Sequence, residues 1–353
     1  MRVLARLAAV AGVLAGASLA AVAQPAWACG CGAMVSDSSV IVSDETSIVR
    51  YDERTRTEDI VMRLSIDSDT TDAAWLFPTP TKAQVKPGDR AWFEQLDRLT
   101  EPRVVTRSRW FGSGDDMAGA APGSADGRVT VLGERRIGPF EVATLDAEDP
   151  SALAGWLRAN GYRLSPKLGR ALRPYVREGW KYVAVKLTPQ GAGSLTGALD
   201  PLHVTFRTPE LVYPMRLSRL ATTDQALHLY VLAGHRVEQT SAIPLRKSFA
   251  GPVTPGQVAS PGLKGFLGDG MYLTELIDRS IRPSSIEDDY RFAAADSDTP
   301  YRDVVYETDD VEILGLPAGW VIVIGVPMLL ATAFTVVTLR RRPRRGVSPE
   351  ARV

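Results

Sequence analysis

A run of 27 residues without a charged side chain lies near the C-terminus, from position 313 to position 339. As an α-helix it would be about 40 Å long at ~1.5 Å per residue, more than the ~30 Å hydrocarbon core of a bilayer. A buried core helix is the alternative, but this run has no polar face. Five arginines follow the run, and such clusters mark the cytoplasmic side of a membrane: Arg340, Arg341, Arg342, Arg344 and Arg345. We therefore predict a transmembrane helix over residues 313–339 and a basic cytoplasmic tail over residues 340–353.

The N-terminus has the pattern of an export signal. Two arginines precede an apolar run over residues 7–23, and small residues then occur at Ala26 and Ala28. A basic start, an apolar stretch and a small-x-small site are typical of a secretory signal peptide. We predict a signal peptide over residues 1–28, cleaved after Ala28, with Cys29 as the first mature residue. An uncleaved anchor helix is the alternative.

A cleaved signal and one later span predict a single-pass type I protein of the cell membrane. The body would lie outside the cytoplasm and the C-terminus inside. Within it we expect one extracytoplasmic domain over residues 29–239, followed by an irregular segment and a polar stalk over residues 240–312. About 280 exported residues can bury a substantial core.

The charge balance argues against nucleic-acid binding. Removing the two arginines of the signal and the six arginines and one glutamate of the tail leaves 33 basic and 40 acidic residues in the body. A body without excess positive charge has little attraction for phosphate backbones. The tail is better explained as a topology signal that also attracts anionic lipid.

Strand patterns dominate the body, with a few short helices between them. Residues 60–66 alternate apolar and polar side chains, as a half-buried strand does. Helix starts are indicated by Asp89 after a Pro-Gly pair, by Asp149 before a proline and by Ser165 before a proline, because Asp and Ser cap helices and proline fits the first turn. The sequence predicts a β-rich α+β fold.

The pattern weakens after position 239. Prolines and glycines recur between residues 244 and 270, residues 271–279 suggest a short helix, and residues 284–310 are polar and acidic. We interpret the last of these stretches as the stalk between body and membrane.

Cys29 and Cys31 are the two cysteines of the chain and its sharpest candidate site. A strained disulfide between them is one interpretation, since the predicted compartment is oxidising. Binding of a soft metal such as Cu(I) is another, although two thiolates make half a site. Lipidation of Cys29 as the first mature residue is a third, and unpaired structural thiols are a fourth.

No catalytic motif stands out elsewhere, and the sequence indicates no cofactor. His203 and His228 each lie on the polar phase of a predicted strand and could face each other across a pair, but their spacing and that of His235 match no zinc site. Acidic pairs such as Asp115-Asp116 and Asp288-Asp289 lie in polar segments and are interpreted as solvated. Catalytic residues are therefore not assigned.

Several motifs in fixed order carry a resemblance to a known family. They are Trp27-Ala28-Cys29-Gly30-Cys31-Gly32, Ala74-Trp75-Leu76-Phe77-Pro78-Thr79-Pro80, Trp156-Leu157 followed by Gly161-Tyr162, and Tyr182-Val183-Ala184-Val185-Lys186-Leu187-Thr188-Pro189. Over about residues 29–234 the chain resembles the bacterial domain-of-unknown-function family 2330. The resemblance implies an export signal, a cysteine-containing mature start and often a C-terminal anchor. It implies no activity and no site residues.

The sequence favours a membrane-anchored binding or envelope-associated module. Lipid around the C-terminal helix is one expected partner, and an envelope or membrane protein is another, because a tail of 14 residues is too short for a signalling domain. The alternatives are an extracytoplasmic hydrolase, which would need carboxylates or histidines gathered in a cleft, and a thiol-redox or metal-binding protein that uses Cys29 and Cys31.

Overall fold

A computed structural model describes residues 26–29, 32–36, 40–111, 141–145, 150–187, 195–241, 244–313 and 316–340. The chain divides into two compact units. Unit 1 comprises Met1–Glu101 with Val131–Asp303, and unit 2 comprises Pro102–Thr130 with Val304–Val353.

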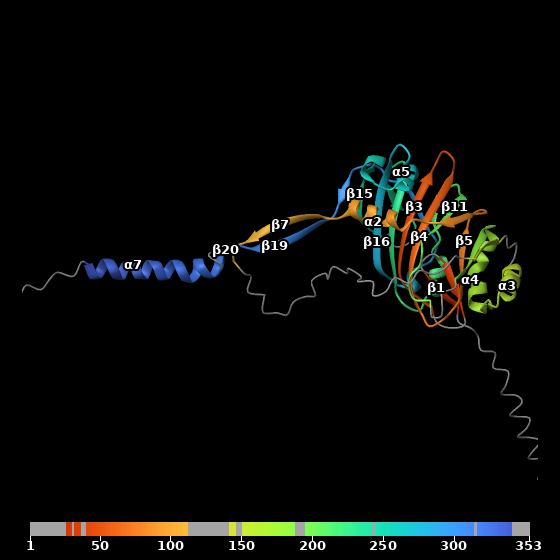
Figure 1. The fold of residues 1–353 in the computed structure, drawn as a ribbon, viewed down its shortest axis with the longest axis horizontal. Helices are drawn as coiled ribbons and strands as arrows, with labels where there is room; N and C mark the ends of the chain where they lie inside the picture. Colours follow the sequence, from red (N-terminus) through yellow and green to blue (C-terminus); the bar gives the residue numbers. More distant parts are fainter. Residues whose placement is uncertain are drawn as a thin grey trace, which may run out of the picture. The chain divides into compact units, whose positions relative to one another are not determined.

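The larger sheet of unit 1 has nine strands (Figure 1). In spatial order they are β18 (Tyr301–Arg302), β15 (Arg246–Val253), β16 (Met271–Ile281), β13 (Gln225–Ala233), β3 (Val40–Asp52), β4 (Thr57–Ser68), β11 (Leu202–Arg207) and β6 (Gln84–Pro87), with β10 (Gly197–Ala198) also paired to β4. Neighbours are antiparallel except β3 and β13, which run parallel. The hairpin of β3 and β4 forms the middle of this sheet.

Two smaller sheets complete the strands of unit 1. The five-stranded one has the order β1 (Ala26–Cys29), β2 (Gly32–Val35), β5 (Ala73–Thr79), β9 (Lys181–Leu187) and β8 (Glu141–Leu145). The three-stranded one has the order β12 (Leu211–Tyr213), β17 (Tyr290–Ala294) and β14 (Val237–Gln239).

The strands alternate their side chains between two cores. Ile48 and Val61 belong to a cluster with the apolar faces of α2 (Arg90–Thr100) and α5 (Pro261–Leu267). Their chain neighbours Val49 and Ile60 belong to another cluster, between the nine-stranded sheet and the two smaller sheets. The period of two along a strand therefore places successive residues in different cores.

A third core lies on the far face of the five-stranded sheet. There α3 (Pro150–Ala159) and α4 (Pro166–Arg177) pack their leucines on β2, β5 and β9. Unit 1 thus has four layers, with helices outside and sheets inside, as the flanking helices in Figure 1 show. Short 3₁₀ turns complete it: η3 (Arg216–Leu220), η4 (Pro255–Gln257) and η5 (Pro283–Ser285). The predicted β-rich α+β class is confirmed.

The helix starts predicted from capping residues are found in the structure. Asp89 accepts a hydrogen bond from the backbone N–H of Ala91 at 2.9 Å, and Ser165 accepts one from the N–H of Leu168 at 3.2 Å. α3 begins at Pro150. These ends were readable because capping is local in sequence.

The segment after position 239 differs from the prediction. Residues 271–279 are part of the strand β16 rather than a helix, and β15 lies beside it within the large sheet. Because β16 is largely buried on both faces, it lacks the alternation that identifies a half-buried strand. Pro255 and Pro261 begin η4 and α5, so these prolines start helices rather than mark an irregular segment.

Unit 2 contains a two-stranded parallel ribbon and the apolar helix. β7 (Arg103–Arg109) pairs with β19 (Val304–Asp310), and a short bridge joins β20 (Glu312–Ile313) to β21 (Leu316–Pro317). α6 (Ala318–Trp320), the π-turn η6 (Val321–Gly325) and α7 (Val326–Arg340) follow. Ala318–Leu339 has the length and hydropathy to span a membrane, with a mean hydropathy of 2.3.

The helix begins five residues later than the charge-free run. β20 and β21 occupy the start of that run. The π-turn ends just before Pro327, whose ring removes a backbone donor from the helix. The basic tail after Arg340 and residues 1–25 of the predicted signal peptide lie outside the described residues.

Candidate binding pocket

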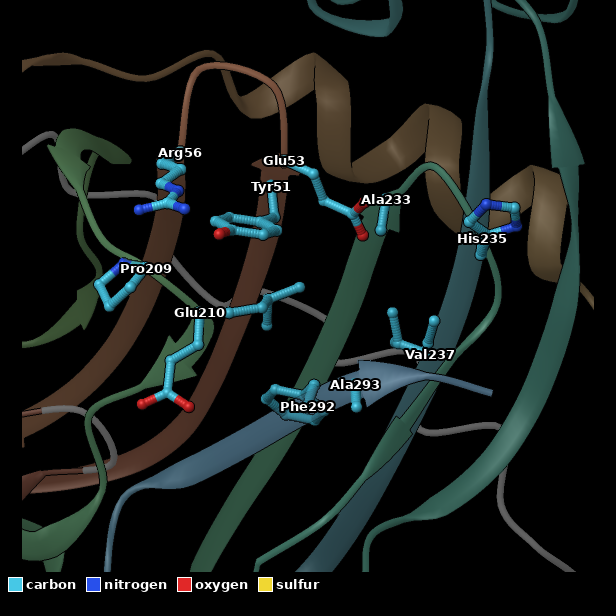
Figure 2. A pocket seen from close by; sticks show the side chains of 12 residues that line it. Tyr51, Glu53, Arg56, Pro209, Glu210, Ala233, His235, Val237, Phe292 and Ala293 are labelled. Carbon is cyan, nitrogen blue, oxygen red and sulfur yellow. The ribbon is translucent and has the colours of Figure 1, made fainter. Parts of the chain in front are cut away.

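A pocket of about 230 Å³ opens beside the loop that joins β3 to β4 (Figure 2). Four separate parts of unit 1 form its wall: the end of β3 and its loop, the turn into β12, the end of β13 with β14, and the end of β17. Its lining residues are Tyr51, Glu53, Arg56, Pro209, Glu210, Leu211, Ala233, His235, Val237, Phe292, Ala293 and Ala294.

Asp52 shapes the loop on one side of the pocket. Its Oδ1 accepts backbone hydrogen bonds from Arg54 at 2.9 Å and Thr55 at 3.2 Å, and the N–H groups of Thr55 and Arg54 lower the pKa of Asp52. Arg56 then adopts a left-handed backbone with φ of 51°. Such a conformation in a non-glycine residue costs about 1–3 kcal/mol and is concentrated at functional sites.

The floor of the pocket is apolar. Leu211, Ala233, Val237 and Phe292 are buried members of the core between the sheets. Tyr51 stands beside them and donates to the carbonyl oxygen of Thr208 at 3.3 Å. Burial, with a smaller effect of nearby carboxylates, raises the pKa of Tyr51, so its hydroxyl remains a donor at neutral pH.

Charged groups of both signs form the rim. Glu210 pairs with Arg291, and Nδ1 of His235 lies 2.9 Å from Oδ2 of Asp298. The hydrogen bond to Asp298 raises the pKa of His235. Within the described part of the chain, the side chains of Glu53 and Arg56 form no ion pair, which leaves a carboxylate and a guanidinium available to a ligand.

A second hollow, of about 400 Å³, adjoins the first along Tyr51 and Glu53. Its other wall is the turn at residues 267–271, where Gly268 and Gly270 have φ of 59° and 122°. The end of β3 therefore separates two depressions. An apolar floor with a few polar groups at its edge is the usual form of a ligand site.

His203 and His228, which the sequence suggested could face each other, lie apart. His203 is on β11 and His228 on β13, with β3 and β4 between those strands. This prediction was wrong because strand neighbours in the sheet are not set by local pattern. Among the described residues, no group of three or more His, Cys, Asp or Glu side chains could hold a metal ion.

Each of these histidines is paired with a buried carboxylate. Nε2 of His203 lies 2.8 Å from Oδ1 of Asp59, which also accepts from Thr205 at 2.6 Å. Burial raises the pKa of Asp59, but the hydrogen bonds from His203 and Thr205 outweigh it and the pKa is lowered. Rings of Trp92 and Phe266 lie 6.2 and 5.6 Å from the His203 ring, measured between centroids. The pair is enclosed and has no open face for a substrate.

Glu275 forms the centre of the second pair. Its Oε1 lies 2.8 Å from Nε2 of His228 and accepts from Thr100 at 2.8 Å, and Ser248 donates to its other oxygen. Serine here donates to the carboxylate rather than to the histidine, so the order differs from that of a serine-hydrolase triad. The network ties the C-terminal end of α2 to β13, β15 and β16.

Asp289 is not solvated, contrary to the sequence interpretation of Asp288-Asp289. Its Oδ1 accepts from the hydroxyl of Tyr175 at 2.6 Å and from the backbone N–H groups of Met215 and Arg216 at 2.8 and 3.0 Å. The neighbouring Asp288 is half exposed and pairs with Arg216. Asp115-Asp116 lies outside the described residues.

The structure describes one residue of the cysteine pair, Cys29. Cys29 ends β1 opposite Gly32, and Cys31 lies outside the described residues. A Cβ atom on Gly32 would lie 2.3 Å from the carbonyl oxygen of Leu76, so only glycine fits at the start of β2, where this strand meets β5. Whether the two thiols form a disulfide, bind a metal, are lipidated at Cys29 or stay unpaired is not tested by the described residues. Cleavage after Ala28 stays a prediction, and it would remove three of the four residues of β1.

The sequence did not single out the pocket. Its lining residues come from four segments that are distant along the chain. The only local signal was the charged turn of residues 52–56 between two strands. Charged turns between strands are common on protein surfaces, so the pattern did not distinguish a site from a solvated loop.

The fold and pocket define a β-rich body with a candidate ligand site, and the described part of the chain also includes one apolar helix long enough to span a membrane. A family model covers residues 25–293, and the chain belongs to this family, DUF2330, described as an uncharacterized protein conserved in bacteria. The match includes β15, β16 and most of β17, and so extends beyond the part in which the motifs were recognised.

No curated protein matches the chain. Among solved structures, the crystal structure of baculovirus P35 is similar over 76% of this chain and 98% of that chain, with 12% identity and a TM-score of 0.31. A likeness of that degree carries no argument about fold or function.

Proposed function

We propose that this protein is a membrane-anchored, extracytoplasmic binding module and that the pocket beside the β3–β4 loop is its ligand site. The observation that carries the proposal is the pocket itself, with an apolar floor, a charged rim and a left-handed residue in its wall. The ligand would place an apolar group on Phe292 and Val237 and a polar group between Glu53 and Arg56. A segment of an envelope or membrane protein meets this description.

A hydrolase that uses His203 and His228 is not proposed. Each histidine is paired with a buried carboxylate of its own. The strands that carry the two histidines are separated by two other strands. The thiol-redox alternative depends on Cys31, which lies outside the described residues.

The pocket can be tested by site-specific photo-crosslinking in intact bacterial cells that express the full chain. A photoreactive amino acid at Ala293, in the pocket, is expected to give a discrete adduct. The same amino acid at Ala259, an alanine beside α5 that is also exposed, is the matched control and is expected to give none. An adduct pattern shared by the two positions, or no adduct from position 293, would contradict the proposed site.

The proposed orientation places the body outside and residues 340–353 in the cytoplasm. The apolar helix and the arginines after it support this topology. A reporter that works only in the cytoplasm is expected to be active when it is fused after Val353. Protease added to intact cells is expected to digest the body. If a reporter that works only after export is active at the C-terminus, the proposed orientation is wrong.

A further inference from the structure

Large apolar side chains are exposed around the N-terminal end of the apolar helix. Trp110 is 52% exposed, Phe111 55%, Leu316 59% and Trp320 68%. Leu316 precedes the helix and Trp320 lies in its first turn, whereas Trp110 and Phe111 come from a segment about 200 residues earlier in the chain. An exposed aromatic cluster is uncommon on a water-facing surface and marks an interaction site.

The ribbon of unit 2 brings the two segments together. Arg109 is the register partner of Asp310, and their side chains form a two-pronged ion pair at 2.7 and 3.1 Å. The N–H of Val311 then donates to the carbonyl of Arg109 at 3.0 Å, and the N–H of Ala318 donates to the carbonyl of Val311 at 2.7 Å. The end of β7 is thereby held against the start of the helix.

The end of β7 is in close contact with the helix at Gly319. A Cβ atom on Gly319 would lie 3.0 Å from the carbonyl oxygen of Trp110 and 3.4 Å from Cα of Phe111. Trp110 and Phe111 therefore lie at the same level along the helix as Gly319 and Trp320.

The length of the helix sets that level relative to a bilayer. Ala318–Leu339 has 22 residues, about 33 Å at ~1.5 Å per residue, which matches a hydrocarbon core of ~30 Å. With Arg340 at one boundary, Trp320 lies at the other. The Arg109–Asp310 ion pair, one residue before Trp110, belongs on the water side because charges are excluded from the core.

We propose that Trp110, Phe111 and Trp320 form an aromatic belt that sits, together with Leu316, in the headgroup layer of the bilayer. Tryptophan favours this layer because its ring is apolar while its N–H seeks a polar partner. The protein would then contact the membrane through two parts of the chain, the helix and the tip of β7. This inference rests on the proposed membrane anchoring.

The test uses the full chain in vesicles of phosphatidylcholine brominated on its acyl chains near the headgroup, which quenches nearby tryptophan fluorescence. Trp110→Phe and Trp320→Phe are each expected to reduce the quenched amplitude by about half, since these are the two tryptophans of the belt. Trp156 is a partly buried residue of α3, and Trp156→Phe is the control that should leave the quenched amplitude unchanged. Circular dichroism verifies that each variant is folded.

The two variants separate the belt from the anchor. If Trp320→Phe reduces quenching and Trp110→Phe does not, the belt is overturned while the helix remains in the membrane. If neither variant reduces quenching, the helix does not lie in the bilayer as proposed, and the belt fails with it. A reduction by Trp110→Phe alone also overturns the belt, because it requires both tryptophans at one level.

Discussion

Replacing Asp289 with alanine is expected to lower the free energy of unfolding by about 3–5 kcal/mol, as removal of one partner from a buried charged network does. Its side chain is fully buried and accepts hydrogen bonds from Tyr175, Met215 and Arg216. Nε of Arg216 also lies 3.1 Å from Oδ2, close enough for an ion pair although not aligned as a hydrogen bond. Without the carboxylate, a phenol and two backbone N–H groups would be buried without partners.

The neighbouring carboxylate provides the matched control. Asp288 is 47% exposed at its side chain, so Asp288→Ala is expected to cost about 0–1 kcal/mol, the range of a surface ion pair. Denaturant unfolding of the full chain in detergent, followed by tryptophan fluorescence, measures both. Asp289→Asn keeps a hydrogen-bond acceptor, so its loss of unfolding free energy should lie between those of the two alanine variants. Equal losses for the two alanine variants would show that Asp289 does not organise η3 and α4.

Glu275→Ala is expected to destabilise the protein by about 2–4 kcal/mol, since Thr100, Ser248 and His228 would lose a shared acceptor. These groups lie on α2, β15 and β13, so the loss should loosen α2 from the sheet. Glu238→Ala is the control, because Glu238 is exposed and pairs only with Arg236 in the described structure. It is expected to cost less than about 1 kcal/mol.

The same carboxylate predicts a pH dependence. Burial raises the pKa of Glu275, but the hydrogen bonds from His228, Ser248 and Thr100 outweigh burial and leave the pKa below its ordinary value of 4.5. A carboxyl with a lower pKa in the folded state stabilises the fold above its unfolded pKa. That stability is lost as the pH falls through the folded pKa. Between pH 7 and pH 3 the unmodified chain should therefore lose more stability than Glu275→Gln, and parallel curves would contradict this.

Local signals in the sequence were sufficient for part of the fold. Asp89 and Ser165 cap helices that begin where their patterns indicate, and the alternation at residues 60–66 identifies β4. In each case the residues that form the sequence pattern also form the contacts of the element, and they lie within one helical turn or one strand. Such elements can be predicted without knowing what they pack against.

The sequence predictions were wrong where the same local pattern fits more than one structure and packing against distant segments decides between them. β16 has both faces covered, so its apolar residues follow no period of two and resemble a helix. Pro255 and Pro261 mark helix starts because Thr254 and Ser260 cap them. Asp289 lies in a polar segment but has no exposure, because its partners come from residues 175 and 215–216.

The sequence by itself determined that the chain has a β-rich body and, near its C-terminus, an apolar helix able to cross a membrane. These properties depend on composition and on periodicity over short stretches. Only the tertiary structure decided which carboxylate each histidine meets, where a pocket opens, and that Trp110 lies against Gly319 at the start of the helix. These are contacts between segments that lie far apart in the chain. Closing the loops between such segments costs entropy, and the packing of all the layers together offsets that cost. No single segment encodes this packing.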